Sequence, residues 1–166
     1  MNLKINDRIV HASFGVGKIK NIVSKEIGGK VRAFFKVKTD KLTYWIPVKK
    51  KDFNKIRPLR TASTFKNTLS VIRKKPQRLS NNFRARSKYI KDQINECSLL
   101  SKARLIRDLH YRNSEKPLHV NEHRIYEKLK NQFVNEFALA AEIQTEEAEE
   151  KLDDALMVSL QKAPEE

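Results

Sequence analysis

The chain has 166 residues and a formal net charge of +15, with 33% charged and 39% hydrophobic residues. That length suits one ordinary domain or two small ones, and the positive charge favours phosphate backbones or other anionic surfaces as partners. A single cysteine excludes an internal disulfide, no apolar run approaches the length of a membrane span, and the first residues lack an apolar signal core, so we expect a cytoplasmic protein that does not bind membranes.

The charge is distributed unevenly along the chain. Residues 1–60 carry 16 basic and 4 acidic side chains, residues 61–112 carry 13 and 3, and residues 113–166 carry 6 and 13. The first two thirds of the chain therefore predict contact with a polyanion, whereas the last third does not.

Residues 1–56 have the pattern of a small β unit. All four glycines fall between positions 15 and 29, and "EIGGKV" predicts a hairpin loop. Short runs rich in valine, isoleucine and aromatic residues predict strands over 7–12, 16–23, 31–38 and 41–48. We expect four or five strands in a strongly bent sheet or SH3-like barrel, followed by a linker at 57–61. Tyr44 and Trp45 should point to opposite faces of their strand.

Residues 62–166 have the pattern of an all-α domain. No glycine follows position 29, and apolar residues recur at helical spacing. We expect five helices, at 62–75, 83–96, 99–113, 121–141 and 145–162. Ser98 and Thr145 are expected N-caps, and Cys97 lies on an apolar stripe, which predicts a buried, inert thiol. The expected fold class is therefore α+β, a small β unit followed by about five helices of which the last is acidic.

The sequence contains no pattern that predicts catalysis. "FGVGKI" lacks the length and the hydroxyl residue of a phosphate-binding loop, so a turn between strands is the expected structure. His119 and His123 could share a helix face, but Val120 stands where a zincin has glutamate and no third ligand is evident, so surface or capping histidines are favoured over a zinc site. We expect no enzyme activity, no metal and no cofactor.

Five segments together carry a resemblance to a known family. They are "NDRIVHASFGVGKIKNI" (6–22), "LTYWIPV" (42–48), "NNFRARSKY" (81–89), "ARLIRDLHYRN" (103–113) and "EFALAAEI" (136–143). In this order and at this spacing the chain resembles the CarD/CdnL regulators over nearly its whole length.

The resemblance implies a function without catalysis. Such proteins are bacterial transcription factors that bind the RNA polymerase β subunit through a Tudor-like N-terminal domain. Their helical domain contacts promoter DNA at the upstream edge of the transcription bubble, where a tryptophan wedges into the minor groove and stabilises the open complex. We expect the same partners here, with little sequence specificity for DNA, a monomer, and association with the nucleoid through the polymerase.

The family's functional positions carry over with changes. The tryptophan position falls on Phe83, and the expected DNA-binding residues are Asn82, Phe83, Arg84, Arg86 and Lys88. An apolar ring of another kind can still enter a minor-groove step. The family's polymerase-facing arginines match Lys25 and Trp45, which are the expected polymerase-binding residues; Lys25 keeps the charge without the planar fork, and Trp45 loses the charge.

Two interpretations of Phe83 remain open. It lies seven residues before Ile90, so it could be the first core residue of its helix. Alternatively it is an exposed wedge, because Arg86 and Ser87 on the same face argue against continuous burial, and Arg84, Lys88 and Lys91 form a basic stripe.

Two other functions fit the charge. One is a general basic nucleic-acid-coating or ribosome-associated protein. The other is an accessory domain similar to the polymerase-binding part of repair-coupling helicases, although the chain has no Walker motif.

Overall fold

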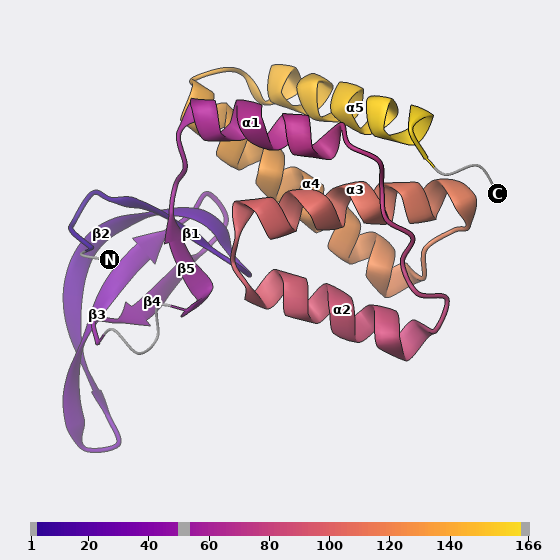
Figure 1. Cartoon of the computed structure of the whole chain (residues 1–166). Coiled ribbons are helices and arrows are strands. Elements are labelled where there is room, and N and C mark those ends of the chain that lie inside the picture. The colour runs from indigo at the N-terminus through magenta and orange to yellow at the C-terminus, as the bar shows by residue number, and fades with distance from the viewer. Residues whose placement is uncertain (1–2, 50–53, 164–166) are drawn as a thin grey trace. The chain divides into compact units, whose positions relative to one another are not determined.

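The computed structural model describes residues 3–49 and 54–163, and its contacts divide the chain into two compact units, Met1–Leu59 and Arg60–Glu166 (Figure 1). Each unit has its own hydrophobic core and is described by itself. A five-stranded sheet precedes five helices within those ranges, which confirms the expected α+β fold class with a Tudor-like unit first. None of the described helices is long and apolar enough to cross a membrane.

The N-terminal unit is one antiparallel sheet with the strand order β4-β3-β2-β1-β5. Its strands are β1 (Arg8–His11), β2 (Gly15–Ile27), β3 (Lys30–Lys38), β4 (Thr43–Pro47) and β5 (Ile56–Pro58). A register shift between Ile19 and Asn21 marks a bulge that bends β2. The core is formed by residues of all five strands, namely Ile9, Ile19, Phe35, Val37, Tyr44, Ile46 and Ile56.

Glycine is required at two places in this sheet. Gly28 and Gly29 have φ of 61° and 71° in the turn between β2 and β3, which confirms the expected hairpin and fits a two-residue turn whose central residues need positive φ. Gly17 faces β3 so closely that a Cβ would lie 2.6 Å from Cγ1 of Val37. The two strands can pair at that point because the side chain is absent.

The sheet extends further along the chain than expected. The four expected strands correspond to β1–β4, but β5 pairs with β1 over residues 56–58, where the linker had been expected to begin. Arg57 in this strand is buried. The three residues of β5, one of them a proline, carry too little apolar pattern to predict a strand. β5 forms because β1 offers it an open edge.

The C-terminal unit contains five helices close to the expected ones. They are α1 (Ala62–Ile72), α2 (Phe83–Asn95), α3 (Leu99–Glu115), α4 (Val120–Ala141) and α5 (Thr145–Gln161). α1 ends three residues earlier than expected because Pro76 disfavours helical geometry in the residue before it. The two carbonyls that follow α1 accept hydrogen bonds from the end of α5: Ser159 donates to the Lys74 carbonyl at 2.8 Å, and the C-cap residue Lys162 donates to the Arg73 carbonyl at 2.9 Å.

Of the two expected N-cap residues, the one of α3 is confirmed and the one of α5 is wrong. Ser98 caps α3, and its hydroxyl accepts a hydrogen bond from the Ser101 amide. Thr145 is already the first residue of α5, and Gln144 stands at the N-cap. Cys97 is half-buried with φ of 50°, so the expected buried thiol is wrong; the residue lies in the tight turn between α2 and α3, where the apolar stripe has ended.

The core of this unit gathers around α1 and the second half of α4. Phe65 of α1 packs against both Phe133 and Phe137 of α4, with ring centroids 5.3 Å apart in each pair. α5 lies beside α1 and contributes Leu152 and Leu156 (Figure 1). α2 contributes little, with only Ile90 as a buried apolar residue. The surface of α2 is thus free for another role.

Candidate functional site

Phe83 begins α2 on the surface of the helical unit. Asn82 is the N-cap, and its Oδ1 accepts a hydrogen bond of 3.1 Å from the Ala85 amide. Phe83 remains 47% exposed and is not part of the hydrophobic core. Of the two interpretations left open by the sequence, the structure therefore agrees with the exposed ring and not with a core residue. The contact of this ring with DNA stays a prediction.

A histidine supports the exposed ring. The imidazole of His119 meets the Phe83 ring edge to face, with centroids 4.9 Å apart and an interplanar angle of 74°. His119 is the N-cap residue of α4, and a capping box with Glu122 fixes its backbone. Sequence reasoning had favoured a surface or capping role for His119 over a metal site, and the N-cap position agrees with that, but the contact with Phe83 was not foreseen. In the described part of the chain no three His, Cys, Asp or Glu side chains are grouped to hold a metal ion.

Arg86 is not on the exposed surface, which corrects its expected role as a DNA contact. The side chain is 2% exposed, and its Nε and Nη2 donate to the two carboxylate oxygens of Glu122 at 2.6 and 3.3 Å. Nη1 donates to the Ser80 carbonyl at 2.6 Å. Position 86 faces inward with Ile90 four residues later. An arginine could be buried there because Glu122, thirty-six residues away in sequence, neutralises it.

The Arg86–Glu122 pair connects the start of α2 to the start of α4. Glu122 also accepts a hydrogen bond from the His119 amide at 3.2 Å. The same carboxylate therefore binds the helix that carries Phe83 and the residue against which Phe83 rests. Such bidentate, charge-assisted bonds fix geometry more tightly than single neutral bonds. Arg86 thus ties the start of α2 to the start of α4, and at 2% exposure it offers little surface to a ligand.

The exposed positive charge of this surface comes from Arg84 and Lys88. Both side chains are exposed, and within the described residues neither has a carboxylate partner. The first turn of α2 contains no acidic residue, and a helix N-terminus attracts anions through its free amides. Two free cations, an aromatic ring and a helix start thus lie within six residues.

The segment before α2 is held against α3. The Gln77 amide donates to Oδ1 of the buried Asp108 at 2.9 Å, and Asn81 accepts a hydrogen bond from Arg112 at 2.8 Å. Arg78 is bonded to Tyr111 and lies 3.2 Å from the Glu115 carboxylate. This segment is therefore built into the fold, and Arg78 is less free to bind phosphate than Lys74 and Lys75, which are exposed.

Lys25 and Trp45 come together on the sheet of the N-terminal unit. The Lys25 ammonium lies 3.3 Å from the centre of the Trp45 ring, although β3 separates their strands. Trp45 is 43% exposed whereas Tyr44 is buried, which confirms that the two point to opposite faces. Cross-strand pairing places Arg32 beside Lys25 and Lys36 beside Trp45 on the same face. The face therefore carries three basic side chains near the exposed Trp45 ring, and sequence reasoning had not included Arg32 and Lys36.

Shifted pKa values are found for a histidine and two tyrosines of the helical unit. Burial, and then the nearby Lys130, lowers the pKa of His110, whose Nδ1 lies 2.7 Å from the Tyr126 hydroxyl; Asp153 acts weakly in the opposite direction. Burial raises the pKa of Tyr126 and of Tyr89. Burial is the largest cause in each case, so these shifts bear on the stability of the helical unit.

Comparison with protein-family models gives a match for each unit. Residues 3–60 match the CarD-like/TRCF RID domain, and residues 67–153 match the C-terminal domain of CarD. The two matches follow each other in the same order as the sheet and the helices, and together they span most of the chain. The chain therefore belongs to the CarD family of RNA polymerase-interacting transcription factors.

Proposed function

We propose that this protein binds the RNA polymerase β subunit through its N-terminal sheet and stabilises the open promoter complex by inserting Phe83 at the upstream edge of the bubble. The observation that carries the proposal is the exposed ring at the first position of α2, supported by His119 and flanked by Arg84 and Lys88. An apolar side chain can wedge into a minor-groove step, and cations beside it can bind the neighbouring phosphates.

The polymerase contact is assigned to the Lys25–Trp45 face. Tryptophan and arginine are the residues most often found at the energetic centre of protein interfaces. Lys25 rests on Trp45, and Arg32 and Lys36 lie beside them, so an acidic partner surface with an apolar recess fits this face best. Residues 1–56 thus serve as the polymerase-binding domain, and residues 62–166 as the DNA-binding domain.

The energy balance explains why DNA contact should depend on the polymerase. Opening a base step costs a few kcal/mol. Stacking an aromatic ring on a base returns about 1–3 kcal/mol. The two nearly cancel on intact duplex, so the ring helps mainly where polymerase has begun to open the DNA. Affinity for free DNA is low, and tethering through the sheet supplies the local concentration.

The test is the lifetime of open complexes after a competitor challenge. Phe83→Ala should shorten the lifetime severalfold, Phe83→Trp should preserve or lengthen it, and both should keep polymerase binding. Met157→Ala removes another exposed apolar side chain, 61% exposed on α5, and should change nothing.

Two outcomes would overturn this function. If Phe83→Ala and Phe83→Trp both lower the melting temperature by many degrees, the ring belongs to the fold. If the wild-type protein binds every duplex with the same affinity, and substitutions of Phe83 leave the open-complex lifetime unchanged, the protein is a general nucleic-acid-coating protein.

A further inference from the structure

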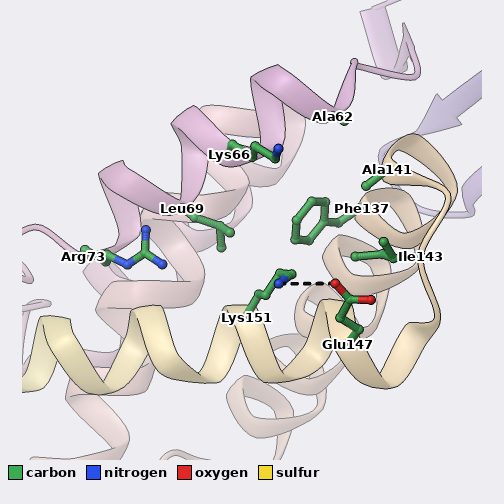
Figure 2. Close-up of a pocket in the computed structure, with 9 residues that line it drawn as sticks. All are labelled: Ala62, Lys66, Leu69, Arg73, Phe137, Ala141, Ile143, Glu147 and Lys151. Carbon is green, nitrogen blue, oxygen red and sulfur yellow. Dashed lines mark ion pairs between the residues drawn. The ribbon is translucent and has the colours of Figure 1, made fainter.

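A cavity of about 410 Å³ opens in the helical unit between α1, the end of α4 and the first half of α5 (Figure 2). The exposed ring and the basic stripe of α2 take no part in its lining. This volume lies in the range of small-molecule sites, about 300–1,000 Å³. The proposed DNA and polymerase contacts leave it without a role.

The floor of the cavity is apolar. Leu69 of α1 and Phe137 of α4 are buried there, and Ala141 and Ile143 are half-buried beside them. Ile143 belongs to the short connection between α4 and α5, where Glu142 takes a left-handed conformation and the chain turns back. The floor is therefore made by three separate segments, and an apolar ligand would touch all of them.

The rim of the cavity is cationic. Lys66 and Arg73 stand on α1, and Lys151 reaches in from α5 (Figure 2). The one carboxylate of the lining, Glu147, forms an ion pair of 3.3 Å with Lys151 one helical turn away. Within the described chain Lys66 and Arg73 have no carboxylate partner, so two positive charges remain over an apolar floor.

We propose that this cavity binds a small amphipathic carboxylate, with an apolar body on Leu69, Phe137 and Ile143 and its carboxylate between Lys66 and Arg73. The hollow shape favours a single soluble molecule over a flat membrane surface or a long peptide. Cations above an apolar floor favour an anionic amphiphile over a neutral apolar molecule, which has no charge to pair with them, and over a cationic amphiphile, which they repel. This binding is independent of the polymerase and DNA contacts.

The probe is dodecanoate below its micelle concentration, titrated into the full-length protein. Methyl NMR spectra should show saturable shifts at Leu69 and Ile143, and isothermal titration gives the affinity. Dodecyltrimethylammonium, with the same apolar chain and the opposite charge, should bind at least about tenfold more weakly, because like charges across the rim repel.

Three variants complete the test. Lys66→Glu should weaken dodecanoate binding about tenfold or more, and Ala141→Leu should weaken it by filling the floor. Lys128→Glu makes the same charge change on an exposed lysine of α4 outside the cavity and should leave binding unchanged.

The proposal is overturned if dodecanoate does not bind saturably, if the cationic amphiphile binds as well, or if Lys128→Glu weakens binding as much as Lys66→Glu. The last result would mean attraction by net charge alone. Should Ala141→Leu fail to fold, the comparison of Lys66→Glu with Lys128→Glu still decides.

Discussion

At the scale of single residues, neighbours in sequence have opposite tasks at the start of α2. Arg84 and Lys88 are exposed and free to bind a polyanion, whereas Arg86 is buried against Glu122. All three are basic and lie within five positions, so residue type alone would predict the same role for each of them. The difference lies in the direction in which each side chain leaves the helix. Arg86 points into the helical unit, whereas Arg84 and Lys88 point into solvent, where a partner can be contacted.

The first prediction concerns Arg86. Arg86→Ala should lower the free energy of unfolding by about 3–5 kcal/mol, because it leaves Glu122 charged and buried without its partner. Replacing both residues with apolar ones of similar size should cost less than the single change. Urea unfolding measures the loss, and Arg84→Ala, at an exposed site, should stay within about 0.5 kcal/mol of the wild type.

An unchanged unfolding midpoint in Arg86→Ala, together with weaker binding to promoter DNA, would contradict this role and return Arg86 to the DNA surface.

At the scale of elements, α2 is a helix whose outer side is exposed and is proposed to contact DNA. It buries one apolar residue, Ile90, yet it is fixed at its N-terminus by Asn82 and by the ion pair to α4. α3 is the opposite case, with most of its residues buried and two further buried ion pairs, Lys102–Glu136 and Arg107–Asp108. The largely buried α3 thus supports the more exposed α2, which packs against it.

The second prediction concerns the basic stripe of α2. Each phosphate that a side chain neutralises adds about −0.9 to the slope of log affinity against log salt. Arg84→Ala and Lys88→Ala should therefore each flatten the slope by about one, measured by fluorescence anisotropy on a fork-junction promoter DNA at several salt concentrations. Lys66→Ala, an exposed lysine of α1, serves as the control. Unchanged slopes in both α2 variants would mean that Arg84 and Lys88 remain in solvent and do not contact phosphate.

The third prediction concerns His110 on α3. Its pKa is lowered in the folded protein by burial, so below about pH 6.5, the ordinary value, the unfolded state takes up more protons than the folded one. The free energy of unfolding should therefore fall as the pH drops below about 6.5. Denaturation at about pH 7.5 and about pH 5.5 measures this loss across the titration range of histidine.

His110→Gln should reduce that pH dependence, and His123→Gln, at an exposed histidine, should not. Identical pH dependence in the wild type and His110→Gln would show that other groups cause it.

At the scale of the whole molecule, two units with separate cores carry separate basic surfaces. The sheet has its own apolar cluster, and the helices have another. The acidic last helix supplies carboxylates that pair with lysines of its own unit, as in Lys130–Asp153 at 2.9 Å. The excess positive charge therefore belongs to the first two thirds of the chain, where both proposed contacts lie.

The fourth prediction tests this division of labour. A fragment of residues 1–60 should fold and bind the polymerase β subunit in a pull-down, because the five strands and the Lys25–Trp45 face are complete within it. Trp45→Ala should weaken the binding, and Leu42→Ala, at a side chain of similar exposure in the β3–β4 turn, should not. A folded fragment that fails to bind, while the full chain succeeds, would contradict the assignment.

The sequence by itself determined the order and type of the elements, because glycine turns and apolar periodicity are local signals. The β2–β3 hairpin, the Ser98 cap and all five helix starts within one residue follow from them. Only the tertiary structure decided what depends on distant partners: Glu122 buries Arg86, β1 extends the sheet through β5, His119 supports Phe83, and Lys25 reaches Trp45 across β3. A side chain's own position sets which way it points, but the residue that it meets there comes from another part of the chain.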